Sequence, residues 1–172
     1  MAMDPAQAYR TAREIALRRL ESRDRTRAEL AVTLRDRETP ETVAAAVLDR
    51  LTEVGLVDDT RFARTWVETR QRTRGLAGQA LSAELRQRGV SDEVVAEAVE
   101  VVDPETEERR ALELARARVA RRRGLAPEVV TRRVAGQLAR RGYSAGVAFR
   151  AVRTAVAEVG PEADVEGPDE SL

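Results

Sequence analysis

The chain contains neither cysteine nor histidine among its 172 residues. Their absence excludes disulfides, thiolate nucleophiles, imidazole bases and the commonest zinc ligands. Lysine is absent as well, so all 30 basic residues are arginine. We attribute this bias first to GC-rich coding, although arginine is also suited to bidentate contacts with carboxylates and phosphates. These absences predict a protein that is not an enzyme and that uses no metal and no cofactor.

Long apolar runs and aromatic residues are scarce too. No run approaches the roughly 18 apolar residues that a membrane-spanning helix needs, and Met1 to Arg10 has neither a basic leader nor an apolar export segment. We therefore expect a cytoplasmic protein that does not bind membranes. Aromatic residues make up only 3% of the chain, whereas alanine, arginine, leucine and glutamate, all strong helix formers, are abundant. This composition favours helices and disfavours strands.

A sequence pattern occurs three times in the chain. It reads Arg-Thr-Arg-Ala-Glu-Leu at 25–30, Arg-Thr-Arg-Gly-Leu at 72–76 and Arg-Arg-Arg-Gly-Leu at 121–125. A leucine follows each copy, at Leu34, Leu85 and Leu138, with spacings of 51 and 53 residues. Units of this size cannot bury a core alone, so they stack into arrays that present a long surface to a partner. The pattern predicts an all-α fold, an elongated tandem array of three three-helix repeats with about nine helices.

Glycine, proline and capping residues divide this array into parts. We expect Gly55, Gly75 and Gly89 to end helices, and Ser91 to cap a helix whose buried residues include Val101. The predicted parts are a flexible N-terminus (1–5), repeat 1 (6–56), repeat 2 (57–103), repeat 3 (104–159) and a disordered acidic tail (160–172).

Two adjacent carboxylates, Asp58 and Asp59, open repeat 2. Such a pair could in principle bind a metal or act as an acid and base. Two facts argue against such a role: side chains at neighbouring positions of a helix start point in different directions, and the sequence nearby offers no third ligand. Capping of the helix that follows is the favoured explanation.

Phe62 and Trp66 lie four residues apart on the same predicted helix. Exposed rings beside positive charge would suit the stacking of single-stranded bases. The two rings belong to one apolar face, however, so packing in the core is favoured over a stacking platform.

Net charge is zero overall, but it is unevenly distributed. Residues 104–159 hold 13 arginines against 6 acids, a net charge of +7, whereas residues 57–103 hold 7 against 9, a net charge of −2. A solvated helix face and a surface for phosphate or an acidic protein are both consistent with the basic region. The arginines expected to face a partner are Arg110, Arg116, Arg118, Arg121, Arg122, Arg123, Arg132, Arg133, Arg140 and Arg141.

The segments described above resemble a known family, the RecX regulators of the bacterial RecA recombinase. Ala16 to Leu20 with Arg27 to Leu30 looks like the first block of the family. Gly55 to Ala63, with Arg72 to Gly75 and Leu85 to Val90, looks like its most distinctive block. The resemblance covers about residues 10–158. The residues that match the family pattern are expected to be mainly structural: Gly55, Asp58, Asp59, Phe62, Trp66, Gly75, Leu85 and Gly89.

One residue departs from the pattern of the repeats. Glu38 stands where the second and third repeats have Gly89 and Gly142. A residue other than glycine can end a helix at modest cost, so this departure affects only the turn itself.

The resemblance implies a non-enzymatic protein that binds the RecA filament on DNA. We expect this protein to be a monomer. Such a protein would inhibit filament extension, ATP hydrolysis and strand exchange, and would thereby modulate homologous recombination, DNA repair and the SOS response. The partners implied are RecA and single- or double-stranded DNA, bound without sequence preference.

The main alternative is a stand-alone helical nucleic-acid-binding protein acting through the basic third repeat. The isoelectric point near 6.5 argues against it, because a dedicated DNA-binding domain is expected above roughly 9. A structural scaffold is a third possibility. An enzyme is the weakest, because the sequence offers neither a Gly-rich phosphate loop nor an acid cluster on one helix face.

Overall fold

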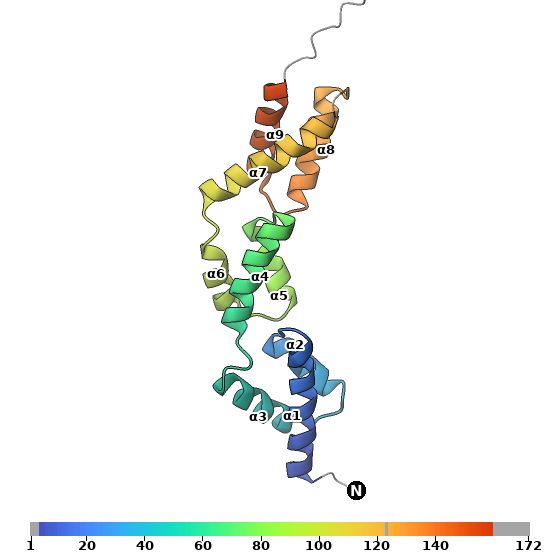
Figure 1. Ribbon diagram of the computed structural model, residues 1–172, viewed down its shortest axis with the longest axis vertical. Helices are drawn as coiled ribbons and strands as arrows, with labels where there is room; N and C mark the ends of the chain where they lie inside the picture. The colour runs from blue at the N-terminus through green and yellow to red at the C-terminus, as the bar shows by residue number, and fades with distance from the viewer. Residues whose placement is uncertain (1–3, 123, 160–172) are drawn as a thin grey trace, which may run out of the picture. The chain divides into compact units, whose positions relative to one another are not determined.

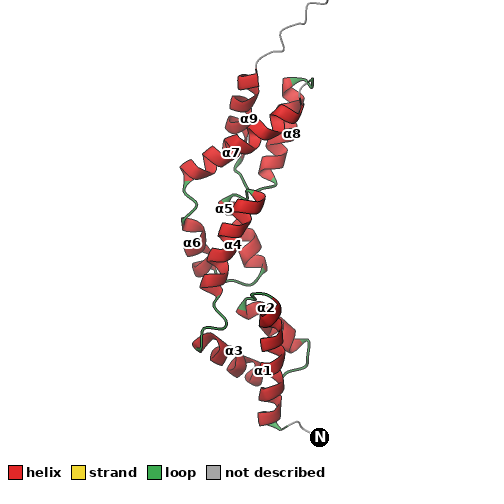
Figure 2. Ribbon diagram, in the orientation of Figure 1, coloured by secondary structure: helices red, strands yellow, loops and turns green. Residues whose placement is uncertain are grey.

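The computed structural model describes residues 4–122 and 124–159, and within these residues every regular element is a helix (Figure 2). Arg123 and the predicted acidic tail at 160–172 lie outside the described residues. The predicted all-α class is confirmed, with nine α-helices and one short 3₁₀ helix in the described part of the chain. They are α1 (Pro5–Ser22), α2 (Arg27–Arg35), α3 (Glu41–Glu53), α4 (Asp59–Arg74), α5 (Gly78–Gln87), α6 (Asp92–Glu100), α7 (Pro104–Val119), η1 (Ala120–Arg122), α8 (Pro127–Ala139) and α9 (Ala145–Val159).

The helices belong to two compact units. The described residues up to Arg74, together with Leu81–Val101, form the first unit. Gly75–Ala80, together with the described residues from Val102 onward, forms the second. The short segment Gly75–Ala80 therefore packs with α7, α8 and α9, although it includes the first turn of α5, whose later residues belong to the first unit (Figure 1).

Each unit buries aliphatic residues between neighbouring helices. In the first unit, α1, α2 and α3 pack together around Leu30, Leu34 and Leu51, and α4 packs against α6. In the second unit, α7, α8 and α9 pack around Val134, Leu138 and other aliphatic residues. Apolar side chains recur at helical spacing on one face of each helix, and removing that face from water is the main stabilising contribution.

The three repeats share one turn of defined geometry, at the end of α2, α5 and α8. The backbone N–H groups of Thr39, Val90 and Tyr143 donate to the carbonyls of Leu34, Leu85 and Leu138, at 3.1, 3.2 and 3.3 Å. In each turn the residue before the donor has a positive φ, which is 57° at Glu38, 75° at Gly89 and 89° at Gly142. The sequence periodicity therefore corresponds to a repeated helix ending of the Schellman kind.

A set of contacts that we call the first joint connects the start of α2 with α4 and with the turn after α5. The Thr26 hydroxyl donates to the carbonyl of Arg88 at 2.7 Å. The Asp59 carboxylate accepts from the backbone N–H of Arg27 at 2.8 Å. A Cβ atom added to Gly89 would lie only 2.3 Å from Cβ of Ala28, so glycine is required there for close approach as well as for its φ.

A second set of contacts, the second joint, lies in the second unit and uses equivalent positions. The backbone N–H of Ala77 donates to the carbonyl of Arg141 at 2.9 Å. The Glu107 carboxylate accepts from the N–H of Gly78, the first residue of α5, at 3.0 Å. A Cβ atom on Gly142 would lie 2.5 Å from the backbone nitrogen of Ala80. The Tyr143 hydroxyl adds a hydrogen bond to the carbonyl of Gly75 at 3.0 Å.

The predicted burial of Val101 is wrong. Val101 was expected to be buried with Ala98, but it is 75% exposed, because α6 ends at Glu100 and Val101 follows its last residue. Val95 and Ala98 supply the buried face of α6 instead.

Candidate functional site

Four of the predicted arginines meet in a groove between the end of α7, η1 and α8, which we call the cationic groove. Its volume is about 610 Å³. The described residues that line it include no carboxylate: they are Ala117, Arg118, Arg121, Arg122, Leu125, Arg133 and Gln137. The sequence predicted these arginines as one basic region, and the structure brings Arg118, Arg121, Arg122 and Arg133 to one opening.

Two of the groove arginines are held by the backbone of α7. Nη1 of Arg118 donates to the carbonyl of Leu114 at 3.2 Å, and Nη1 of Arg122 donates to the carbonyl of Arg118 at 2.8 Å. These carbonyls lie near the C-terminal end of α7, where the helix dipole favours positive charge. The guanidinium groups are thus fixed in place before any ligand arrives, which reduces the entropy lost on binding.

The positive charges in the cationic groove are crowded. Burial lowers the pKa of Arg118, and the neighbouring charges of Arg141, Arg122 and Arg121 lower it further. An arginine remains protonated at neutral pH despite such a shift. The repulsion from these neighbouring arginines, which adds to the effect of burial, indicates that positive charge accumulates here, and an anion in the groove would relieve it.

Two more predicted arginines, Arg132 in α8 and Arg140 directly after it, add to the positive surface. Arg132 and Arg140 are exposed but do not line the groove. Within the described part of the chain, no carboxylate lies at ion-pair distance from Arg121, Arg132, Arg133 or Arg140. These side chains are therefore available to a partner.

Three predicted arginines have other surroundings. Arg116 makes a double hydrogen bond with Glu158 of α9 at 2.7 and 2.6 Å, which raises the pKa of Arg116 and lowers that of Glu158. Arg110 is half-buried near Tyr143, and its Nη1 is buried without a hydrogen-bond partner among the described residues. The backbone carbonyl of Arg141 belongs to the second joint. The last of the predicted arginines, Arg123, lies outside the described residues.

The adjacent carboxylates have different partners. Asp58 accepts from the N–H of Arg61 at 2.8 Å and caps α4, as predicted. Asp59 instead caps α2 through Arg27, and burial raises the pKa of its carboxyl group. No group of three or more acidic residues in the described ranges could hold a metal ion. The pair is therefore accounted for by two helix starts.

The aromatic pair is partly covered by arginines. Phe62 is buried, as expected, and its ring stacks on Trp66 at a centroid distance of 5.6 Å. Trp66 is only half-buried, and the guanidinium carbons of Arg70 and Arg88 lie 4.1 and 3.9 Å from its ring centroid. Its indole N–H donates to Glu84 at 2.8 Å. These contacts, with cation–π character, occupy the ring and disfavour base stacking on it.

The remaining residues of the family pattern occupy structural positions. Leu85 is fully buried, and Gly55 and Gly75 follow the ends of α3 and α4 with positive φ. Sequence reasoning did not single out Arg88, which donates to Glu29 at 2.6 Å and also covers the ring of Trp66. The one sequence feature that could have pointed to Arg88 is its position next to Gly89 in the repeated turn. Among the described residues, no helix is long and apolar enough to cross a membrane.

Comparison with known proteins agrees with this arrangement. Residues 12–51 match the RecX first three-helix domain, and residues 58–99 match the RecX second three-helix domain. A regulatory protein RecX of Thermobifida fusca is 51% identical over 166 residues, which cover 96% of this chain and 90% of the relative. The Streptomyces coelicolor regulatory protein RecX is 45% identical over 165 residues, which cover 96% and 88%.

Solved structures show the same fold. The crystal structure of RecX from Lactobacillus salivarius superposes with a TM-score of 0.79 at 19% identity, covering 87% of this chain and 97% of the other. A second crystal structure of a regulatory protein RecX gives a TM-score of 0.76 at 23% identity, covering 90% and 79%. With relatives this similar over nearly the whole length, the chain belongs to the RecX family of regulatory proteins.

Proposed function

We propose that this protein is a non-enzymatic regulator that binds the RecA filament on DNA and inhibits its extension, its ATP hydrolysis and strand exchange. Family membership supports the regulatory role. The observation that carries the DNA contact is the cationic groove, where four arginines line one opening with no carboxylate among the described lining residues. The groove and the exposed Arg132 and Arg140 contact the phosphates of the filament DNA.

The physical basis is electrostatic. Each arginine that neutralises a phosphate releases a counterion, so the affinity falls as salt is raised. Arginine also forms bidentate hydrogen bonds with phosphate oxygens. Such contacts carry no base information, so the protein binds DNA of any sequence and recombination is regulated wherever filaments form.

The first experiment is to titrate the full-length protein into RecA filaments preassembled on single-stranded DNA while ATP hydrolysis is measured. Inhibition at substoichiometric ratios is expected. A protein that acts only when it coats the DNA, and that binds bare DNA equally well without RecA, would be a general nucleic-acid binder instead.

A charge variant tests the groove directly. The triple variant Arg121→Gln, Arg132→Gln, Arg133→Gln changes only exposed side chains. We expect its affinity for the filament at low salt to fall by roughly tenfold or more, and the slope of log affinity against log salt to shrink by about 2 to 3.

The control variant changes three exposed arginines of the first unit, Arg13→Gln, Arg18→Gln and Arg37→Gln, and so removes the same charge. Its affinity should stay close to that of the wild type. Equal losses in the two variants would mean that only net charge matters, and unchanged binding by the groove variant would refute the DNA contact.

A further inference from the structure

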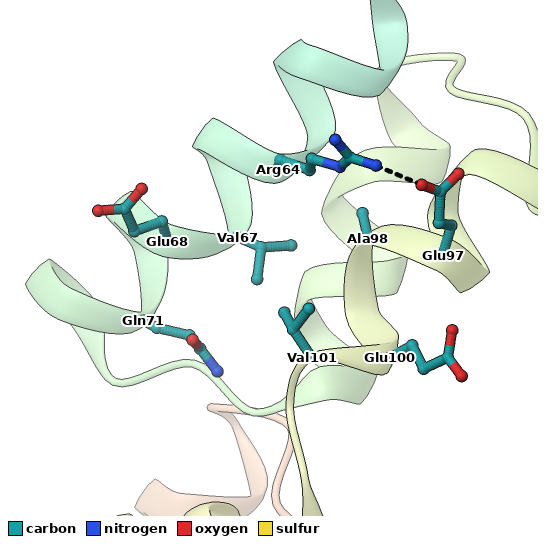
Figure 3. A pocket seen from close by; sticks show the side chains of 8 residues that line it. All are labelled: Arg64, Val67, Glu68, Gln71, Glu97, Ala98, Glu100 and Val101. Atoms are coloured by element: carbon teal, nitrogen blue, oxygen red, sulfur yellow. Dashed lines mark hydrogen bonds and ion pairs between the residues drawn. The ribbon is translucent and has the colours of Figure 1, made fainter.

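The first unit contains a second groove, between α4 and α6, which we call the central groove (Figure 3). Its volume is about 590 Å³. Val67 and Val101 face each other across it, with Ala98 beside them, as Figure 3 shows. The described residues that line it are Arg64, Val67, Glu68, Gln71, Glu97, Ala98, Glu100 and Val101.

The floor of the central groove is apolar and partly open to water. Val67 and Ala98 are buried parts of the core, at 2% and 3% exposure, whereas Val101 is 75% exposed. Among the large apolar side chains that the structure describes as exposed, Val101 has the highest exposure. A single exposed valine is ordinary on a protein surface. Here it extends a buried apolar floor into an open groove, which is the form of a binding site for an apolar side chain.

The rim of the central groove is acidic. Its lining includes three glutamates, Glu68, Glu97 and Glu100, and one arginine, Arg64. Arg64 pairs with Glu97 at 2.5 Å, and Glu68 lies 3.5 Å from Arg72 in an exposed pair that contributes little. No ion pair or hydrogen bond within the described ranges engages the Glu100 carboxylate. The central groove therefore has the opposite sign to the cationic groove.

We propose that the central groove binds a protein segment in which an apolar side chain is flanked by arginine or lysine. The apolar side chain packs on Val67, Ala98 and Val101, and the cations lie against Glu68 and Glu100. A net negative groove repels phosphate, so its occupant is protein and not DNA. The assignment of that segment to the filament rests on the proposed function: the two grooves divide the work, one contacting DNA and the other contacting the recombinase.

The test separates filament binding from DNA binding. The double variant Glu68→Lys, Glu100→Lys and the single variant Val101→Asp change exposed side chains, so both should fold. Each is measured with preassembled RecA filaments and with bare single-stranded DNA of the same length. The matched control is Glu14→Lys, Glu21→Lys, which makes the same charge change on exposed positions of α1. Helix content by circular dichroism verifies folding.

We expect the central-groove variants to bind filaments at least roughly tenfold more weakly, with bare-DNA affinity unchanged or increased, because added lysines attract phosphate. The control should keep its filament affinity. If the wild type binds filaments and the variants bind them equally well, the central-groove proposal is wrong and the proposed function stands. If the wild type does not bind filaments at all, both the proposed function and the central-groove proposal are wrong. Wild-type self-association that the same variants abolish would identify a second copy as the occupant and overturn the recombinase assignment.

Discussion

The first and second joints differ in chemistry while keeping the same geometry. At the first joint, side chains make the connections: the Thr26 hydroxyl reaches the carbonyl of Arg88, and Arg88 in turn reaches Glu29. At the second joint, the backbone N–H of Ala77 reaches the carbonyl of Arg141, and Tyr143 reaches the carbonyl of Gly75. Each joint contains a carboxylate that caps the start of α2 or α5. Each also contains a glycine turn that packs tightly against that same helix start.

The two joints show which features the repeat requires and which it tolerates. The positions of the cap and of the glycine turn are kept at both joints, because helix starts need an acceptor and the turn has no room for a Cβ atom. The atoms that connect the two sides vary, because any buried donor and acceptor pair satisfies the same carbonyl. At Glu38, where the described residues form no such joint, the turn keeps its positive φ but has no need of glycine.

The largest loss of stability is expected when the glycine of a joint is replaced by alanine. Gly142→Ala places a Cβ atom 2.5 Å from the backbone nitrogen of Ala80, at a φ of 89°. Strain and overpacking together should destabilise the second unit by about 3 kcal/mol or more. Gly89→Ala meets the Cβ atom of Ala28 at 2.3 Å and should destabilise the first unit by a similar amount. Urea unfolding followed by circular dichroism measures both changes.

Gly55→Ala is the control for φ alone, because its φ is 73° but no atom lies within 4 Å of the added Cβ. This substitution should lower the free energy of unfolding by only about 1 kcal/mol. Equal losses at Gly55 and Gly142 would show that close packing at the joints is not the reason for glycine.

The hydroxyl groups at the joints should contribute unequally. Thr26 is fully buried, donates to Arg88 and also accepts from the N–H of Glu29 at 3.1 Å, so Thr26→Val loses two hydrogen bonds. We expect a loss of about 2 kcal/mol, against about 1 kcal/mol for Tyr143→Phe, which loses one. Trp66, the single tryptophan, lies in the unit of the first joint. Thr26→Val should therefore shift the fluorescence transition more than Tyr143→Phe does, and the reverse order would contradict the assignment.

The carboxylate of the first joint provides a pH-dependent prediction. Burial raises the pKa of Asp59, so the folded state holds its proton more tightly than the unfolded state does. The associated stability is fully present below the ordinary pKa, near 4, and is lost as pH rises through the raised folded value. Asp59→Asn keeps an acceptor and removes the ionisation.

Lowering the pH from neutral should therefore stabilise the wild type relative to Asp59→Asn across that window. At neutral pH, Asp59→Asn should stay within about 0.5 kcal/mol of the wild type, and Asp59→Ala should lose about 1 kcal/mol with the cap. Chemical unfolding at a series of pH values measures both. A stability difference between wild type and Asp59→Asn that does not change with pH would be inconsistent with a buried, ionising carboxylate.

Local features of this fold were predictable from sequence, and contacts between distant segments were not. The repeated leucines located the three turns, and Ser91 caps α6 as predicted. The partner of Asp59 lies 32 residues away, and the partner of Arg116 lies 42 residues away. Composition identified a basic third repeat, but only the packing of α7 against α8 shows which arginines share a groove, and only its packing against α9 shows that Arg116 is paired with an acid.

The smallest expected effect concerns the turn that belongs to no joint. Glu38 is exposed and has a φ of 57°, a conformation that costs a non-glycine residue about 1 kcal/mol. Glu38→Gly removes that strain but increases the entropy of the unfolded chain, so we expect a net stabilisation of only about 0.5 kcal/mol. The reverse substitution at the equivalent turn, Gly89→Glu, should lower the free energy of unfolding far more, because Ala28 occupies the space that the new side chain would need. If Glu38→Gly were instead strongly destabilising, the Glu38 side chain would have to make an essential contact, and the rule that only joined turns require glycine would be wrong.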